Sequence, residues 1–333
     1  MKIIVPKFEE IFSFENILAS FNEFKRGKHN KKDVAEFSMN LVSNICTLRD
    51  EMMAGSYQHG GYKYFKIFDP KNRDIHKASV RDRIVHHCLY RSLYFYFNNF
   101  FIHDSYSCRF GKGTHRALKR FNEFGRSESL NNKKTVWILK CDIKKCFASV
   151  DQRILKVILR KYIFCPKITQ VVGSVVDSFN SGILGKGIPL GNLTSQLFIN
   201  IYMNEFDQFM KRRLKVRFYI RYADDFVMFD RDRDCLLELI LLMANFLDES
   251  LGLVLHPNKI YLKTFASGMD FLGWVNFSNH KVLRMATKKR MFRKIIEKGG
   301  KKEIVESYLG LLSYGNEYNL QMKVKSLYDI IEL

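Results

Sequence analysis

The sequence predicts an α+β fold, and two kinds of segment carry this prediction. Runs of strand length, at residues 62–68, 135–142 and 216–229, occur between helical segments in the order strand, helix, helix, hairpin, helix and hairpin. Residues 192–215 instead repeat their apolar side chains at three- and four-residue steps, as an amphipathic helix does. Because 47% of the 333 residues are hydrophobic, the chain has ample material for a buried core.

The first hundred residues are expected to be helices around one hairpin. Residues 1–60 have a mostly helical pattern. Residues 62–68 alternate well enough for a strand, and Asp-Pro-Lys-Asn at 69–72 is typical of a turn. Ile75 begins the returning strand, and a helix is expected over residues 81–101.

The middle of the chain begins with an apolar run of strand length at residues 135–142. Ser149 and Gln152 have the spacing of a capping box, which predicts that a helix starts there. A longer helix is expected over residues 192–215, and its buried stripe would consist of Ile199, Met203, Phe206, Met210 and Leu214.

The last third predicts two hairpins separated by a helix. Residues 216–222 and 226–229 are strand-like runs around a short acidic turn. A helix is expected over residues 236–247, and residues 271–277 and 281–285 would form the second hairpin. The tail that follows is basic and then amphipathic helical.

Charge and composition restrict the possible partners. Lys and Arg number 55 against 34 Asp and Glu, and the net charge of +21 indicates a polyanion such as nucleic acid, with a generally basic surface as the alternative. No apolar run approaches the roughly 20 residues that span a bilayer, so no membrane partner is expected. The seven cysteines include no Cys-x-x-Cys pair, and the first residues lack an apolar signal region, so a cytoplasmic location is expected.

Three aspartates form the expected centre of the chemistry. Asp224 and Asp225 lie at the tip of a hairpin, where adjacent carboxylates repel each other unless a cation binds them. Asp142 ends an apolar strand, where a buried acid is costly unless it is paired or metal-bound. With the strand beside the hairpin, Asp142 would face Asp224, and the acids would hold two Mg²⁺ ions about 4 Å apart, with Mn²⁺ as a substitute. Capping of a turn or of a strand end is the alternative.

A series of motifs in one fixed order resembles those of reverse transcriptases. Tyr-Ala-Asp-Asp at residues 222–225 resembles the family's signature box, and Asp142-Ile-Lys-Lys-Cys-Phe147 resembles its first catalytic motif. The resemblance implies an RNA-directed DNA polymerase with a right-hand polymerase fold, made of fingers, a palm of antiparallel sheet plus helices, and a helical thumb. Further similar motifs lie at residues 71–76, 80–85, 105–115, 187–196, 253–259 and 271–274.

The resemblance also assigns nucleotide-binding roles. Phe147 would lie under the sugar and exclude a 2′-hydroxyl, with core packing as the alternative. Lys71 and Arg73 would hold the triphosphate by charge-assisted hydrogen bonds, unless they are solvated turn residues. Lys259 would protonate or neutralise the departing pyrophosphate, unless it is an ordinary surface lysine. Ile143 directly follows Asp142, and the resemblance implies that it takes part both in nucleotide binding and in metal binding.

Three more nucleotide-binding residues come from the motif at residues 187–196. Gly191 would let the backbone approach the nucleotide, because it lacks a Cβ atom. Gln196 would reach a base edge or the sugar, or would simply start a helix. Leu190 would lie near the templating base.

The resemblance implies the domain organisation as well. Residues 1–134 would contain the N-terminal helices and fingers with part of the palm, residues 135–285 the palm with a fingers insertion around 160–195, and residues 286–333 the thumb. An RNA–DNA hybrid would be held by its backbone shape. The residues expected to contact template and primer are Tyr222, Lys288, Lys289, Arg290 and Arg293.

The box Leu190-Gly-Asn-Leu-Thr-Ser-Gln196 resembles the reverse transcriptases of diversity-generating retroelements, within the group II intron-like bacterial family. Intron and retron enzymes typically have Gln or Ala before the glycine and Ser-Pro at the end. The resemblance implies mutagenic retrohoming, in which a template-repeat RNA is copied into cDNA mutated at template adenines to diversify a target gene. It also implies a small, basic, oligomeric accessory variability protein as a partner, beside template RNA and deoxynucleoside triphosphates.

Two other functions stay open at this point. The chain would alternatively be a stand-alone bacterial reverse transcriptase of a defence or retron-like system. A catalytically silent RNA-binding scaffold is the second alternative, although such a protein is expected to have lost some of its three aspartates.

Overall fold

The computed structural model describes residues 7–69 and 71–332, and it has the α+β architecture that the sequence predicts. The chain divides into two compact units. The first unit contains the described residues up to His103, together with Ile143–Lys215 and Met243–Leu255, and the second contains Asp104–Asp142, Val216–Leu242 and the residues from His256 onward. This division follows compactness alone, so the expected boundaries of fingers, palm and thumb stay a prediction.

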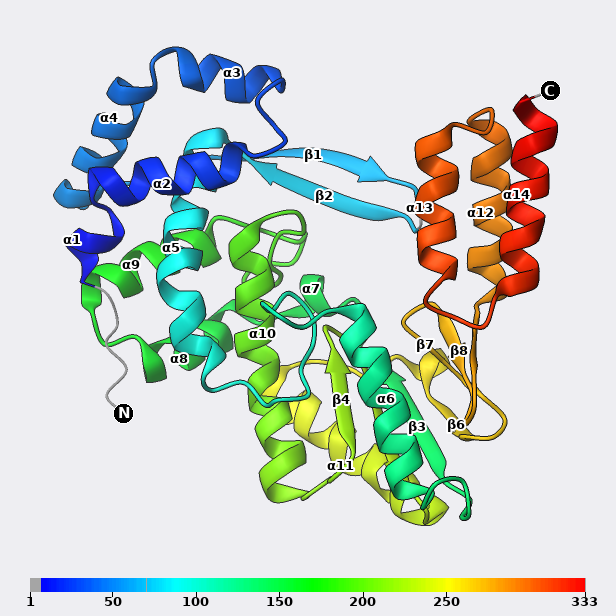
Figure 1. Cartoon of the computed structure of the whole chain (residues 1–333). Coiled ribbons are helices and arrows are strands. Elements are labelled where there is room, and N and C mark those ends of the chain that lie inside the picture. Colours follow the sequence, from blue (N-terminus) through cyan, green and yellow to red (C-terminus); the bar gives the residue numbers. More distant parts are fainter. Residues whose placement is uncertain (1–6, 70, 333) are drawn as a thin grey trace. The chain divides into compact units, whose positions relative to one another are not determined.

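Helices make up most of the first unit (Figure 1). Helix α5 packs against both α2 and α10. Ser13 and Ser79 cap α2 and α5, because their side-chain oxygens accept the backbone N–H groups of Asn16 and Asp82. These helices confirm the helical pattern of the described N-terminal region. The set is α1 (Phe8–Ile11), α2 (Phe14–Lys25), α3 (Lys32–Met39), α4 (Leu41–Ala54), α5 (Val80–Asn98), α7 (Cys146–Ser149), α8 (Gln152–Tyr162), α9 (Pro166–Asp177) and α10 (Leu193–Gln208).

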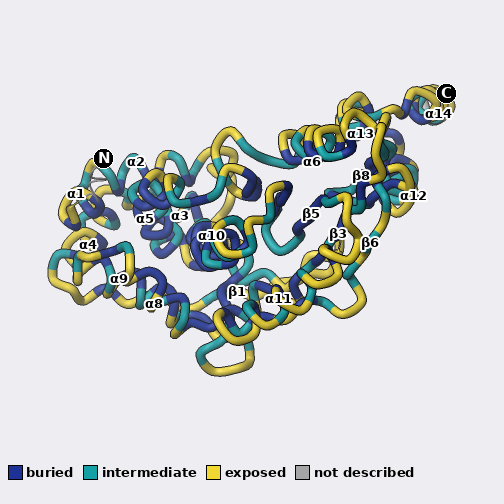
Figure 2. The backbone as a smooth tube through the Cα atoms, turned by 90° about the horizontal axis from the view of Figure 1, so that it is seen from below, coloured by how far each residue is buried: buried dark blue, intermediate teal, exposed yellow. Residues whose placement is uncertain are grey.

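Helix α10 is buried along most of its length, as the dark blue tube in Figure 2 shows. It continues into a π-helical turn at Phe209–Arg213. The buried positions include polar residues such as Asn200 as well as the apolar ones, so burial surrounds the helix. Four residues of the predicted stripe are buried and Leu214 is half-buried, the buried four being Ile199, Met203, Phe206 and Met210.

The first unit also carries a two-stranded hairpin, β1 (Tyr62–Ile67) and β2 (Arg73–Ala78). The strands are antiparallel, and their register pairs Tyr62 with Ala78 and Ile67 with Arg73. Figure 1 shows the hairpin as a long ribbon extending from the helices of its unit. The predicted strand is therefore confirmed, and the returning strand begins at Arg73, two residues before the expected Ile75. The predicted turn at 69–72 includes Pro70 and lies partly outside the described residues.

The second unit is built on a four-stranded sheet with the order β4-β5-β3-β6. Neighbouring strands are antiparallel throughout. Strands β4 and β5 form the predicted hairpin around the two adjacent aspartates. The strands are β3 (Trp137–Asp142), β4 (Tyr219–Tyr222), β5 (Asp225–Asp230) and β6 (Tyr261–Thr264).

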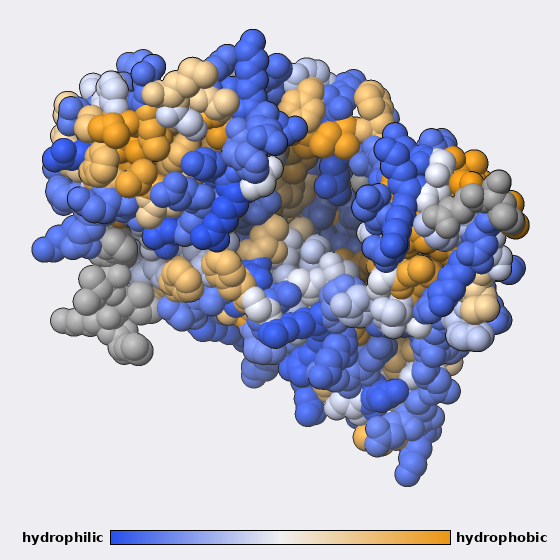
Figure 3. Space-filling view, turned by 45° about the horizontal axis from the view of Figure 1, so that its top comes forward, coloured by the Kyte–Doolittle hydropathy of each residue, from blue (hydrophilic) through white to orange (hydrophobic). Residues whose placement is uncertain are grey.

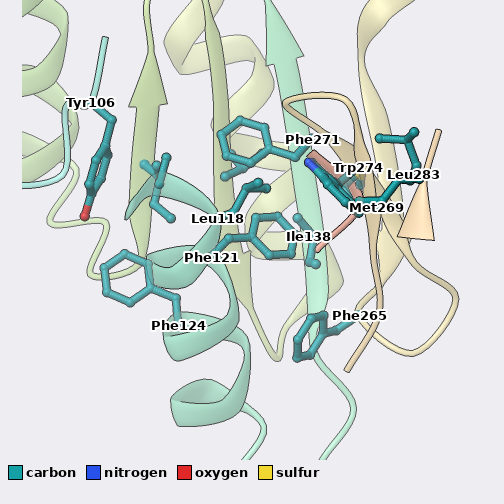
Figure 4. Close-up of a cluster of buried hydrophobic side chains, with 14 of the residues drawn as sticks. Tyr106, Leu118, Phe121, Phe124, Ile138, Phe265, Met269, Phe271, Trp274 and Leu283 are labelled. Atoms are coloured by element: carbon teal, nitrogen blue, oxygen red, sulfur yellow. The ribbon is translucent and has the colours of Figure 1, made fainter. Parts of the chain in front are cut away.

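Helix α6 (Thr114–Glu128) covers one face of this sheet through an aromatic core (Figure 4). The ring of Phe121 lies 4.8 Å from Phe229 and 5.5 Å from Phe271, measured between ring centroids. A Cβ atom on Gly125 would come within 2.4 Å of the Phe265 ring, so only glycine allows this approach of helix to sheet. This packing holds the strands that carry the aspartates.

A second, three-stranded sheet and three helices complete the second unit. The sheet consists of β7 (Met269–Phe271), β8 (Trp274–Asn276) and β9 (Lys281–Leu283). The helices lie side by side in Figure 1, and their presence confirms the expected helical tail for the described residues. They are α12 (Met285–Glu297), α13 (Lys302–Leu312) and α14 (Tyr318–Glu332).

Three local predictions need correction. Helix α8 is capped by Asp151, which accepts the N–H groups of Arg153 and Ile154, whereas Ser149 ends the short helix α7. Residues 271–277 are not one strand, because Leu272 adopts a positive φ of 52° and turns the chain between β7 and β8. The helix expected over 236–247 is longer, since α11 runs over Arg233–Leu251.

Hydrophilic side chains cover most of the face shown in Figure 3, with smaller apolar patches between them. This surface fits a chain in which 27% of the residues are charged. None of the helices in the described part of the chain combines the length and the apolar character that a membrane crossing requires.

Candidate active site

The aspartates of the second unit meet where β3 and β5 pair. In the antiparallel register Asp142 lies directly opposite Asp225, so the two side chains point to the same face of the sheet. Ala223 and Asp224 form the two-residue turn between β4 and β5, and Asp225 is the first residue of β5. Asp142 was predicted to face Asp224, but the register places Asp225 opposite it instead.

The turn of the β4–β5 hairpin is held in a backbone conformation that few side chains adopt. Ala223 has a φ of 56°, in the left-handed region. The guanidinium of the fully buried Arg221 donates to the Ala223 carbonyl at 3.0 Å and to the Ser105 hydroxyl at 3.1 Å. The buried guanidinium of Arg221 therefore stabilises the backbone of the turn that carries Asp224.

A lysine contacts Asp142. The ammonium of Lys259 donates to Asp142 Oδ1 at 2.9 Å, and it is the more exposed partner, with 39% of its side chain accessible against 17% for Asp142. The backbone N–H of His256 also donates to the Asp142 carbonyl, at 2.8 Å, which anchors the Pro257–Lys259 turn beside β3. Lys259 thus lies beside the carboxylate of Asp142, while its predicted role toward pyrophosphate stays a prediction.

A second lysine contacts Asp225. Lys140 Nζ lies 3.3 Å from Asp225 Oδ2 and donates to the Asp270 carbonyl at 2.8 Å. Burial raises the pKa of Asp225 to about 7, and Asp142 and Asp224 raise it as well, while Lys140 lowers it. The other oxygen, Asp225 Oδ1, is buried without a hydrogen-bond partner among the described residues. This carboxylate is therefore short of positive charge.

A divalent cation fits this arrangement. An unpartnered buried carboxylate oxygen, a raised pKa and neighbouring acids are what a hard cation such as Mg²⁺ would relieve. The described residues contain no cluster of three or more His, Cys, Asp or Glu side chains gathered for a metal. The protein would thus supply part of a coordination sphere, from Asp142, Asp224 and Asp225, as is usual where substrate phosphates supply the rest.

Ile143 and Phe147 follow Asp142 in the chain and belong to the first unit. Ile143 is buried and forms an isolated antiparallel bridge with Leu255. Phe147 is half-buried in α7, and its carbonyl accepts the N–H of Ile188 at 2.9 Å. The backbone around this aromatic side chain is therefore fixed, whereas its predicted contact with a sugar stays a prediction.

The structure gathers most of the other predicted nucleotide-binding residues on and beside the hairpin of the first unit. The Leu190 carbonyl accepts the N–H of His76 in β2 at 3.0 Å. Gly191 has a φ of 106°, and a Cβ atom there would lie 2.8 Å from Ile75 Cγ2. Leu190 is half-buried, and three further members of the set are exposed to solvent, namely Lys71, Arg73 and Gln196.

The predicted template–primer residues lie in the second unit. Tyr222 is half-buried, and its hydroxyl accepts a hydrogen bond from Thr114 Oγ1 at 3.3 Å. Lys288 pairs with the buried Glu317 at 2.9 Å and is thereby held against its own unit. Lys289 and Arg293 are exposed on α12, and Arg290 is half-buried beside them.

Sequence reasoning missed Lys140 and Arg221, which hold the carboxylates and the turn. A signal for Lys140 existed, because it stands two residues before Asp142 in an apolar strand and therefore on the same face. Arg221 likewise interrupts the apolar strand before the acidic turn. Their partners, Asp270 and Ser105, lie more than a hundred residues away in the chain, and no local pattern indicates them.

Comparison with known proteins gives several relatives. The chain is 24% identical to protein YkfC of Escherichia coli (strain K12) over 289 residues, which covers 73% of this chain and 72% of that protein. It is 29% identical to a 91 kDa protein in the cob intron of Schizosaccharomyces pombe, with 42% and 17% of the chains covered. It is 20% identical to the COX1/OXI3 intron 2 protein of Saccharomyces cerevisiae, with 78% and 37% covered.

Solved structures show the same fold. Apo telomerase from Candida tropicalis gives a TM-score of 0.55 at 13% identity, and its form truncated from the C-terminal domain gives 0.51 at 14% identity. These matches cover 76% and 73% of this chain but only 53% and 60% of the telomerase chains, so the chain spans little more than half their length. The likeness confirms the predicted right-hand polymerase fold.

The family comparison agrees with the motifs and with the fold. The sequence model described as "Reverse transcriptase (RNA-dependent DNA polymerase)" matches residues 69–275, which is more than half of the chain. The matched region includes Asp142, Asp224 and Asp225 together with strand β2 and the box at Leu190. This chain therefore belongs to the reverse transcriptase family of RNA-dependent DNA polymerases.

Proposed function

We propose that this reverse transcriptase copies a template-repeat RNA into adenine-mutagenised cDNA for the diversification of a target gene. Two observations support the two parts of the proposal. The opposed Asp142 and Asp225, with Asp224 in the adjoining turn, support polymerase activity. The box from Leu190 to Gln196 supports the diversity-generating role, because it has Leu before the glycine and Ser-Gln at its end.

The chain's own residues would divide the work of nucleotide addition. Asp142, Asp224 and Asp225 would hold two Mg²⁺ ions. These ions, when bound, would activate the primer 3′-hydroxyl and offset the charge on the departing pyrophosphate. Lys259 would neutralise or protonate the pyrophosphate from its place beside Asp142, since its side chain is partly exposed there.

The first unit would select the incoming nucleotide. Lys71 and Arg73 would bind the triphosphate by charge-assisted hydrogen bonds. Phe147 would exclude the 2′-hydroxyl of a ribonucleotide by contact with the sugar. Leu190 would face the templating base with an apolar side chain, and the loss of a polar group there would loosen base selection opposite adenine.

The proposed partners follow from the same role. Template RNA and the RNA–DNA hybrid would bind through backbone contacts to the basic residues of α12, which fits the net charge of +21. A small, basic, oligomeric accessory variability protein would assist cDNA synthesis.

Primer extension on an RNA template with Mg²⁺ tests the polymerase. Wild-type protein is compared with Asp224→Ala and with a matched control, Asp234→Ala, whose side chain is 81% exposed in the first turn of α11. We expect extension by the wild type and the control and none by Asp224→Ala. Extension by Asp224→Ala at the wild-type rate would refute the assignment of the metal site, and absence of extension by the wild type, with native RNA and the accessory protein added, would favour a silent RNA-binding scaffold.

Sequencing of the cDNA tests the diversity-generating role. We expect the errors to concentrate opposite template adenines and to decrease at those positions in Leu190→Gln. Accurate cDNA from the wild type would move the assignment to a stand-alone enzyme of a defence or retron-like system. Unchanged adenine errors in Leu190→Gln would remove Leu190 from the explanation.

A further inference from the structure

Asn192 stands at the start of α10 but does not cap it. An asparagine at this position commonly accepts a backbone N–H bond from the first helical turn. In the described α10 its side chain makes no such bond, although its backbone is extended as in other N-cap residues. The side chain is nevertheless buried, with only 2% of the residue exposed. A buried amide needs hydrogen-bond partners, and it finds them outside its own helix.

The partners of Asn192 are both backbone groups of β2. Asn192 Nδ2 donates to the His76 carbonyl at 2.8 Å, and Asn192 Oδ1 accepts the N–H of Ala78 at 3.3 Å. The Leu190 carbonyl adds a third bond, from the N–H of His76 at 3.0 Å. The segment from Leu190 to Asn192 thus occupies the edge of β2 that does not face β1. The side-chain amide of Asn192 forms the donor and acceptor bonds that the backbone of a neighbouring strand would otherwise form.

Gly191 allows this segment to lie directly on the strand. Its φ of 106° is a conformation that glycine adopts readily, and a Cβ atom would stand 2.8 Å from Ile75 Cγ2. The three bonds and this close approach surround a single short stretch of β2. Since β2 begins at Arg73, the contact fixes the strand that leads to the predicted triphosphate-binding residues.

We propose that Asn192 is a positioning residue for nucleotide selection, which holds hairpin β1–β2 in register against Leu190 and Gly191. A carboxamide suits this role because one planar group offers both a donor and an acceptor. Aspartate keeps the acceptor and loses the donor, and alanine loses both. The proposal rests on the proposed function, since that function gives Lys71, Arg73 and Leu190 their contacts with the nucleotide.

Amide hydrogen exchange of the protein alone tests the structural half. In Asn192→Ala the Ala78 amide loses its acceptor, and we expect it to exchange at least about tenfold faster. In Asn192→Asp the Ala78 amide should stay protected, because a carboxylate oxygen still accepts its hydrogen bond. The Thr169 amide in α9 serves as the internal reference, since it bonds to the Cys165 carbonyl, which belongs neither to β2 nor to the segment from Leu190 to Asn192. Unchanged exchange at Ala78 in Asn192→Ala would overturn the proposal.

Steady-state kinetics test the functional half. Both variants should raise the KM for deoxynucleotides about three- to tenfold and change the error spectrum, while kcat at saturating nucleotide stays within about twofold. The control is Asn99→Ala, which also removes an amide-to-carbonyl bond, from Asn99 Nδ2 to the Phe95 carbonyl at 2.9 Å, at an exposed site. It should leave the KM and the errors unchanged.

The outcomes separate the two levels of the proposal. A variant with fast Ala78 exchange but wild-type KM and errors would overturn the selection role, because Asn192 would then only stabilise the fold. A wild-type protein that never extends a primer would defeat the proposed function and the selection role with it. The exchange experiment needs no activity and would still decide whether Asn192 holds the hairpin.

Discussion

The two units of the molecule differ in whether the side chains of their proposed site residues have protein partners. In the second unit two of the aspartates proposed for catalysis already have protein partners, because Lys259 contacts Asp142 and Lys140 contacts Asp225. In the first unit Lys71 and Arg73 end in solvent, and what the protein fixes there is the backbone of the box around Gly191.

This difference suggests which properties each unit controls. Side chains that are preorganised around a metal site determine whether the reaction occurs at all. A fixed backbone with exposed side chains determines which substrate fits, because the substrate itself completes the contacts. We therefore expect substitutions in the second unit to remove activity and substitutions in the first to change selectivity.

The largest effect is expected for Asp225→Asn, which keeps the shape of the side chain and removes its charge. Primer extension should fall by about a thousandfold or more, since a charged ligand of the expected metal ions is lost. The melting temperature without metal should not fall, because the repulsion from Asp142 and Asp224 is removed as well. If the rate of primer extension by Asp225→Asn were within tenfold of that of the matched control, Asp234→Asn, the proposed difference between the two units would be wrong.

Lys140→Met should have the next largest effect. It removes the cation that connects Asp225 with the Asp270 carbonyl, and it leaves the carboxylate unsupported. Loss of such an outer partner typically lowers metal affinity or activity by about ten- to a hundredfold. The measurement is a Mg²⁺ titration, followed both by primer extension and by the Mg²⁺-induced rise in melting temperature. Lys140→Arg keeps the charge and should recover part of the effect, and an unchanged Mg²⁺ requirement in Lys140→Met would show that Lys140 only packs.

Much of this architecture was predictable from sequence, for local reasons. Asp142 could be recognised because an acid at the end of an apolar strand is unusual, and Asp225 because two adjacent acids follow a strand. The β1–β2 hairpin was predictable because its alternation and turn residues lie within a few positions of each other.

The remainder depended on contacts between distant segments. Lys140 meets Asp270 across 130 residues, and Asn192 meets β2 across more than a hundred. The cap of α8 was predicted wrongly because Ser149 and Asp151 are both good capping residues, and only the path of the chain decides between them. The break between β7 and β8 was missed because Leu272 takes a conformation that its residue type does not indicate.

A pH dependence should distinguish the metal site from the rest of the molecule. The pKa of Asp225 is raised from 3.8 to about 7, so the folded protein keeps a proton that the unfolded chain has already released. The resulting contribution to metal-free stability is fully present below pH 3.8 and is lost as pH rises through about 7. Mg²⁺ competes with the same proton, so its apparent affinity should fall about tenfold between pH 8 and pH 6.

Melting temperatures with Mg²⁺ and with a chelator, measured across this range, check that expectation. The control is Asp225→Asn, in which the pH dependence of the Mg²⁺ effect should disappear. An equal Mg²⁺-induced rise at pH 6 and pH 8 in the wild type would contradict the prediction.

Phe147→Val tests the selectivity expected of the first unit. A smaller side chain should admit the 2′-hydroxyl, so the preference for deoxynucleotides over ribonucleotides should fall by about tenfold with little change in the rate of DNA synthesis. Competition between the two nucleotide types during extension measures this preference. Phe164→Val provides the matched control, because that ring is 80% exposed. A uniform loss of rate without a change in preference would mean that Phe147 only packs.

The smallest effect is expected on α12, where two adjacent lysines differ in their surroundings. Lys289 is exposed, so Lys289→Ala should weaken binding of an RNA–DNA hybrid about two- to threefold and reduce the salt slope of binding by about one. Lys288 pairs with Glu317, which is only 6% exposed, so Lys288→Ala should instead lower the melting temperature and leave the salt slope unchanged. Fluorescence anisotropy over a range of salt concentrations measures both variants. Equal salt slopes for the two variants would mean that Lys288 leaves Glu317 and contacts the nucleic acid instead. The lysines of α12 would then form their contacts only when the nucleic acid binds, as is expected of Lys71 and Arg73 with the nucleotide.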